Sequence, residues 1–256
     1  MTAEPLSLSR LYGRTFQLLW QDGPLIAALW LPLCAAGILS AAGLEWLMHD
    51  AGPSRPTAEV LPWMVESLPS FIADAAVVWV ALRRLRGGRG PALGGWRGAA
   101  MMLGAVIAID LVENVPDLAQ TLAPAWATDP LQPFYDLGVL LVMSVWTALW
   151  LPAVAGAVDE RKGGPTSLGR GLALATGHFS MLTTFALSVY IVGRLLTLVI
   201  AYGFNAAGYG ATPGWVVDLI VLPVGAFGSV SQAVVYWELT RLKTGLTPAG
   251  AAEVFS

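Results

Sequence analysis

Charged residues are scarce in this sequence. They make up 12% of its 256 residues, whereas soluble domains carry roughly a quarter. Hydrophobic residues account for 56% of the chain, and its mean hydropathy is +0.65. A globular interior of this length cannot hide so much apolar surface. The composition therefore excludes an ordinary soluble domain and predicts a membrane protein with several spans.

Cysteine and histidine are also rare, and their scarcity excludes two kinds of site. Cys34 is the one cysteine, so the chain can form neither an internal disulfide nor a cysteine metal site. The two histidines, His49 and His178, fall on opposite sides of the predicted membrane. They cannot share the clustered ligands that a metal hydrolase needs.

Other catalytic and binding motifs have little support. The glycine-rich stretch "GGRGPALGGWRG" follows a predicted membrane helix rather than a strand, which argues against a nucleotide loop. An aspartate pair within the membrane, Asp110 with Asp74 or Asp218, could in principle act as a protease, but no motif accompanies it. The basic residues are dispersed beside apolar helices, which argues against nucleic-acid binding. We therefore expect neither enzyme activity nor a cofactor.

Six apolar runs are long enough to cross a hydrocarbon layer of about 30 Å. They cover residues 24–48, 60–82, 99–116, 133–157, 179–202 and 214–237. The sequence therefore predicts an all-α bundle of six transmembrane helices, forming a single integral membrane domain over residues 1–256.

An amphipathic segment precedes the first run, at residues 7–21. In "SLSRLYGRTFQLLWQ", Leu8, Leu11 and Leu18 recur at helical spacing, while Arg10 and Arg14 occupy the other face. This pattern predicts a helix that lies in the membrane interface and anchors the N-terminus.

The positions of lysine and arginine predict the orientation of the chain. Apart from Arg55 and Arg194, they fall in the N-terminal segment, in the loops after the second and fourth runs, and in the tail. Short cytoplasmic loops are enriched in Lys and Arg. We therefore predict that both termini lie in the cytoplasm.

The basic segments have related shapes, which suggests an internal repeat. "RGGRGPALGGWRG" resembles "ERKGGPTSLGRG", and the tail "LKTGLTPAGAAEVF" has a similar order of Gly, Pro and small residues. Three parallel units, each an amphipathic segment followed by two spans, are one interpretation. The other is that short cytoplasmic loops rich in Ala, Gly and Arg look alike by composition.

Two longer stretches carry a resemblance to a known family. They are "LPAVAGAVDERKGGPTSLGRGLALATGHFSMLTTFAL" and the ending "VVYWELTRLKTGLTPAGAAEVF". Both resemble parts of the YciC-like proteins, a bacterial six-span family whose membrane domain is also fused ahead of glycerophosphodiester phosphodiesterase domains. Thr240 stands where a second Arg is more usual. The resemblance implies a domain of the bacterial inner membrane that has no agreed chemistry.

An acidic ladder ends the third apolar run. In "DLVENVPD", the residues Asp110, Glu113 and Asp117 lie within about 60° of one another around a helix. The ladder would run from the middle of the membrane to its outer interface. Pro116 cannot donate a backbone hydrogen bond, so the helix is expected to bend or end there.

Other runs carry polar residues of their own. A charged side chain at the centre of a membrane helix costs roughly 2.5 to 3.5 kcal/mol when it faces lipid. The sequence therefore predicts that these residues face the interior of the bundle, and that Arg194 pairs with Asp110 or Glu113. The candidate residues of this polar vestibule are Asp110, Glu113, Asp117, Arg194, Glu66, Asp74, Asp218 and Gln232.

Two functions fit this pattern. The first is a membrane scaffold or accessory protein without catalysis, in which the polar residues hold the helices together. The second is a transporter, or a protein that binds a lipid or cation in an outward-facing acidic cavity. Membrane lipids are the expected partners, and a protein partner or a second copy of the chain remains open. Contact with anionic lipid is predicted for Arg10, Arg14, Arg83, Arg84, Arg86, Arg97 and Arg170.

Overall fold

The computed structural model describes residues 6–49, 55–88, 95–115, 132–160, 164–207 and 214–244. This part of the chain is helical and contains no strand. The helices are α1 (Leu8–His49), α2 (Arg55–Leu85), α3 (Gly95–Glu113), α5 (Gln132–Trp150), α6 (Ala153–Glu160), α7 (Gly164–Ala175), α8 (Phe179–Ala206) and α9 (Gly214–Thr244).

Five segments of the described chain are long and apolar enough to cross a membrane. They are Leu8–His49, Val60–Leu85, Leu137–Glu160, Phe179–Ala206 and Trp215–Thr244. These segments support the predicted class, an all-helical membrane protein.

The predicted third span, 99–116, corresponds to α3, which is not among these five segments. This helix has 19 residues, and Arg97, Asp110 and Glu113 are charged. The predicted span also continues to Pro116, which lies outside the described residues. The sixth span and the three-unit repeat therefore remain predictions.

Two predicted boundaries differ from the structure, and both involve proline. The interfacial segment 7–21 and the first run belong to one continuous helix, α1, which contains Pro24 and Pro32. The fourth run is divided instead, because α5 ends at Trp150 and α6 begins at Ala153, with Pro152 in the turn between them. Proline removes a backbone donor and disfavours helical geometry in the residue before it.

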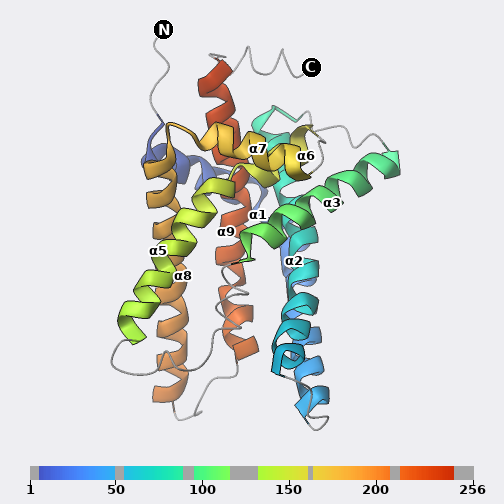
Figure 1. Ribbon diagram of the computed structural model, residues 1–256, viewed down its shortest axis with the longest axis vertical. Helices are drawn as coiled ribbons and strands as arrows, with labels where there is room; N and C mark the ends of the chain where they lie inside the picture. Colours follow the sequence, from blue (N-terminus) through green and yellow to red (C-terminus); the bar gives the residue numbers. More distant parts are fainter. Residues whose placement is uncertain are drawn as a thin grey trace.

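The helices form two groups joined at one end (Figure 1). One group is α1, α2 and α9, which pack on one another, and the other is α5 packed chiefly on α8. The short helix α6 lies where the groups meet and contacts α2, α3, α7 and α9.

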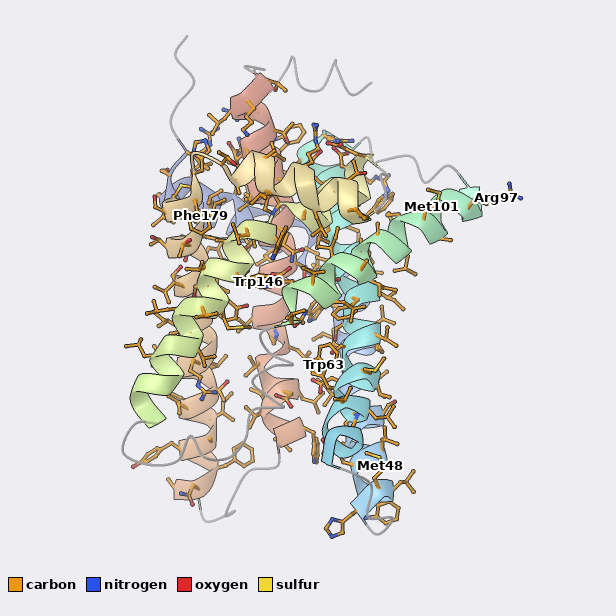
Figure 2. All side chains as sticks on the ribbon, viewed as in Figure 1. Met48, Trp63, Arg97, Met101, Trp146 and Phe179 are labelled. Atoms are coloured by element: carbon orange, nitrogen blue, oxygen red, sulfur yellow. The ribbon has the colours of Figure 1, made fainter. Side chains whose placement is uncertain are left out.

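The path of the chain can be followed in Figure 1. α1 begins and α9 ends at the top of the view, and α1 and α2 are connected at the bottom. α2 ends at the top and α5 begins at the bottom, so the chain passes from one end of the bundle to the other between them. α3 makes the upper part of this passage and projects outward, with Arg97 and Met101 at its far end (Figure 2). The rest of the passage lies outside the described residues.

The core is concentrated at the end of the bundle where α1 begins and α9 ends. Residues 229–240 of α9 are all buried, as are residues Ala153 to Val158 of α6. The buried residues of α8 are Leu182, Phe185 and Ala186, all near its beginning. The bundle is therefore tightly packed at one end and loosely packed at the other.

Small residues permit the closest helix contacts. A Cβ atom added at Gly37 of α1 would lie 2.6 Å from the backbone oxygen of Glu66 in α2. A Cβ atom at Gly171 of α7 would lie 2.8 Å from the Cβ of Ala153 in α6. Close backbone approach at small residues is the usual packing mode of membrane helices.

Candidate functional site

A cavity of about 730 Å³ lies between the two groups of helices. Its walls come mainly from α3, α5, α8 and α9, with Trp30 of α1 and Asp74 of α2 also in the lining. This volume falls within the range of about 300 to 1,000 Å³ that is typical of small-molecule sites. The cavity is therefore a candidate ligand site.

Five of the eight predicted vestibule residues line this cavity. They are Asp74 on α2, Asp110 and Glu113 on α3, Arg194 on α8 and Gln232 on α9. Residues from four helices, far apart in the sequence, are thus brought to one place.

The other three predicted residues do not contribute to the cavity in the described part of the chain. Asp117 lies outside the described residues. Glu66 is half-buried and Asp218 is exposed, and neither lines the cavity. Glu66 instead lies within electrostatic range of Asp218 and Glu45.

Asp110 is the most buried acid of the predicted ladder, with 2% of its surface exposed. Within the described residues, its Oδ2 atom has no hydrogen-bond partner. Its backbone oxygen accepts a hydrogen bond from Asn114 Nδ2 at 2.8 Å. A buried polar atom without a partner costs about 1 to 3 kcal/mol, and more when it is charged. A ligand or water that donates to Oδ2 would remove this cost.

Two further polar groups lie in the same cavity. Ser229 Oγ donates a hydrogen bond to Asp74 Oδ1 and so joins α9 to α2. Gln232 is 8% exposed, and its Oε1 atom has no hydrogen-bond partner among the described residues. Together with Asp110, these groups present mainly acceptor oxygens to the cavity.

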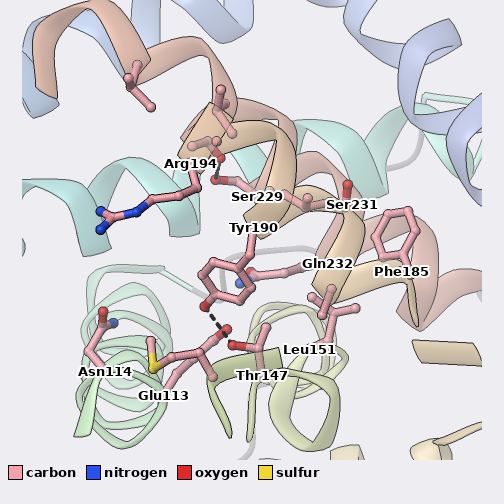
Figure 3. Close-up of a pocket in the computed structure, with 18 of the residues that line it drawn as sticks. Glu113, Asn114, Thr147, Leu151, Phe185, Tyr190, Arg194, Ser229, Ser231 and Gln232 are labelled. Carbon is pink, nitrogen blue, oxygen red and sulfur yellow. Dashed lines mark hydrogen bonds between the residues drawn. The ribbon is translucent and has the colours of Figure 1, made fainter. Parts of the chain in front are cut away.

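A tyrosine and a threonine complete the polar surface. Figure 3 shows Tyr190 of α8 pointing toward Thr147 of α5, and their hydroxyl oxygens are 2.9 Å apart. Trp146 of α5 donates its indole N–H to the backbone oxygen of Val112 in α3 at 2.9 Å. These two bonds connect the α5 wall of the cavity to its neighbours on either side.

The predicted pairing of Arg194 with Asp110 or Glu113 is not seen. Arg194 is exposed and forms no ion pair with any residue that the structure describes. Figure 3 shows its side chain extending away from Tyr190 and Gln232. Arg194 lines the cavity but is exposed, so its guanidinium is not enclosed with the buried acids. Burial beside the acids would instead require it to lose its hydration.

Trp30 fixes the wall of the cavity that α1 and α9 form. Trp30 of α1 donates its indole N–H to the backbone oxygen of Leu222 in α9 at 2.9 Å. A Cβ atom at Gly225 would lie 2.6 Å from Cζ2 of this ring, so glycine makes room for it. No pattern in the sequence indicated this contact.

A second buried polar cluster lies at the packed end, and the sequence did not indicate it as a site. Glu238 of α9 is 1% exposed and forms ion pairs with Arg10 at 3.1 Å and with Arg14, both in α1. Arg241, three residues further along α9, lies 3.9 Å away. The i,i+3 spacing of Glu238 and Arg241 was the only signal available, because the other two arginines come from the opposite end of the chain.

The neighbouring acids Asp159 and Glu160 at the end of α6 form a related cluster. Arg86 pairs with Asp159, and Arg170 pairs with Glu160. The Tyr236 hydroxyl of α9 lies 2.7 Å from Asp159 and 3.1 Å from Glu160, and can donate to one of them at a time. The Arg86 side chain is 8% exposed because Asp159 engages it inside the protein, and its contact with anionic lipid stays a prediction.

None of these polar sites has the ligand set of a metal centre among the described residues. Within the part of the chain that the structure describes, no group of three or more His, Cys, Asp or Glu residues is placed to hold a metal ion. The chemistry that the cavity offers is therefore hydrogen bonding and charge.

No family model, curated protein or solved structure matches this chain. The resemblance to the YciC-like proteins accordingly remains a prediction. Function is therefore inferred from the geometry of the cavity and of the packed end.

Proposed function

We propose that this chain is an integral protein of the bacterial cytoplasmic membrane that binds a ligand in the cavity between α5–α8 and α1–α2–α9, in transport or lipid handling. The observation that carries this proposal is the buried carboxyl of Asp110, a residue of the cavity lining whose Oδ2 atom has no partner among the described residues. Intramembrane acids of this kind commonly mark ligand or ion pathways.

The cavity extends from the packed end toward the loosely packed end. Its lining on α8 runs from Phe185 to Thr197, and its lining on α9 runs from Gln232 back to Val221. The packed end also contains arginines of the basic segments, namely Arg10, Arg14, Arg86, Arg170 and Arg241. The positive-inside rule assigns such an end to the cytoplasm. The proposed cavity therefore opens toward the outer face of the membrane.

The first test of this proposal is to fill the cavity. Gly228 lines it, and a Cβ atom added there would meet no atom within 4 Å. Gly203, near the end of α8, has equally open surroundings and does not line the cavity. We expect Gly228→Phe to remove a ligand that co-purifies with the wild type, and Gly203→Phe to retain it.

The measurement is native mass spectrometry of each protein released from lipid nanodiscs. A single bound mass in the wild type and in Gly203→Phe, absent from Gly228→Phe, supports a ligand-binding cavity. A broad lipid population that is the same in all three proteins would count against it.

The alternative is a scaffold or accessory role without catalysis. The observation that favours it is the rigid packed end, where Glu238 is held by Arg10 and Arg14 and Asp159 is held by Arg86. Such a platform could present the basic segments to lipids or to a protein partner. If cavity filling leaves the bound molecules unchanged, this becomes the better-supported function.

A further inference from the structure

The buried part of the cavity, called its closed end below, presents acceptor oxygens without a partner among the described residues. Asp110 Oδ2 and Gln232 Oε1 are buried and have no hydrogen-bond partner in the described chain, and the Asp74 carboxylate lies in the same lining. Asp74 and Asp110 also interact electrostatically with each other. A molecule that satisfies this end must donate hydrogen bonds, and positive charge would favour it further.

The charges of the lining residues also favour a positively charged ligand. Asp74, Asp110 and Glu113 are acidic, and Arg194 is the basic residue of the lining. Arg194 is exposed and forms no ion pair with an acid among the described residues, so it does not neutralise the buried acids. The closed end of the cavity therefore carries a negative potential when the acids are ionised.

Much of the remaining lining is apolar. Leu140 and Met143 of α5 face the cavity together with Phe185 and Val189 of α8 and Val224 of α9. A hydrocarbon chain would find the same surroundings there as in lipid. The volume of about 730 Å³ suits one such chain together with a small head group.

We infer that the ligand is an amphiphile with a primary ammonium head, which donates its N–H groups to Asp110, Gln232 and Asp74 while its chain lies between α5, α8 and α9. This inference rests on the proposed function and names the ligand class for the same cavity. An ammonium has three donors and no acceptor, which complements the acceptor oxygens at the closed end. A quaternary ammonium has the charge but no N–H to donate.

The experiment compares three probes of equal chain length: dodecylammonium, dodecyltrimethylammonium and dodecanol. The full-length protein is placed in phosphatidylcholine nanodiscs, because that lipid has no N–H donor, and one-to-one adducts are quantified by native mass spectrometry. We expect dodecylammonium to bind at least tenfold more tightly than either other probe. Asp110→Asn should remove this preference, and Glu66→Gln, which changes a carboxylate outside the cavity, should retain it.

Two further variants make the outcomes distinguishable. Gln232→Met removes an acceptor without altering a charge. It replaces Asp110→Asn as the test of the probe preference if Asp110→Asn does not fold. Equal binding of all three probes, unaffected by either variant but abolished by Gly228→Phe, would overturn the ammonium class and leave the ligand-binding cavity standing. Adducts that persist in Gly228→Phe would overturn both, and the absence of any adduct would overturn the ammonium class alone.

Discussion

At the scale of single residues, burial decides what each charge does. Glu238 and Asp22 both pair with arginine from another helix, but the Glu238 side chain is 1% exposed and the Asp22 side chain is 22% exposed. The pair between Asp22 and Arg84 spans 3.4 Å at the surface, where the Arg84 side chain is 52% exposed. Water and salt screen the second pair and not the first.

Replacing Glu238 by Gln should therefore destabilise the packed end. The change removes the carboxylate around which Arg10, Arg14 and Arg241 gather, and breaking a buried ion pair costs roughly 3 to 5 kcal/mol. The free energy of unfolding in mixed micelles measures the loss. Arg84→Gln is the control, with an expected loss of about 0 to 1 kcal/mol. Similar losses in the two variants would contradict the structural role assigned to Glu238.

At the scale of elements, small residues determine how closely the helices approach. Gly37 and Gly43 both lie in α1, separated by less than two turns. Only Gly37 faces a neighbouring backbone, that of α2 at Glu66, whereas an added Cβ at Gly43 would meet nothing within 4 Å. The same substitution at the two positions therefore tests the packing of α1 on α2.

We expect Gly37→Ala to separate α1 from α2 locally and to destabilise the protein by about 1 to 3 kcal/mol, as overpacking does. Gly43→Ala should be neutral, or stabilising by up to about 1 kcal/mol through helix propensity. Melting temperatures in detergent compare the two variants directly. If both variants melt at or above the temperature of the wild type, the close contact at Gly37 does not contribute to stability.

At the scale of the whole molecule, the central question is whether α3 carries the chain across the membrane. Five segments qualify as spans by length and composition. An odd number of crossings would place the ends of the chain on opposite faces. In the structure, α1 begins and α9 ends at the same end of the bundle (Figure 1). This arrangement favours a sixth crossing between α2 and α5.

Cysteine labelling can decide the number of crossings. Cys34 is the one cysteine of the chain, so Cys34→Ala provides a background without thiols. In that background we expect Arg97→Cys to react only from the cytoplasmic side and Leu137→Cys only from the outside, with a membrane-impermeant maleimide in intact cells and inverted vesicles. Labelling of both positions from one side would show that α3 and the chain that follows it do not cross.

Much of the architecture could be predicted from the sequence because the signals for it are local. Scarce charge and long apolar runs determined the class, and the runs at 60–82, 179–202 and 214–237 lie within α2, α8 and α9, which extend beyond them by up to seven residues. The grouping of Asp110 and Glu113 on one face followed from helical periodicity. Proline positions were visible too, although the sequence could not say that α1 continues through Pro24 and Pro32 while the chain turns at Pro152.

Only the tertiary structure decided which polar residues meet. Whether Arg194 reaches Asp110 depends on the rotation of α8 and on its distance from α3, and neither quantity is encoded in spacing along one helix. The same applies to Glu238, whose partners Arg10 and Arg14 lie at the other end of the chain. By itself, the sequence determined a helical membrane protein with buried acids, because composition and periodicity are local properties. The cavity and its unsatisfied oxygens arise from packing between helices, which is a property of the whole fold.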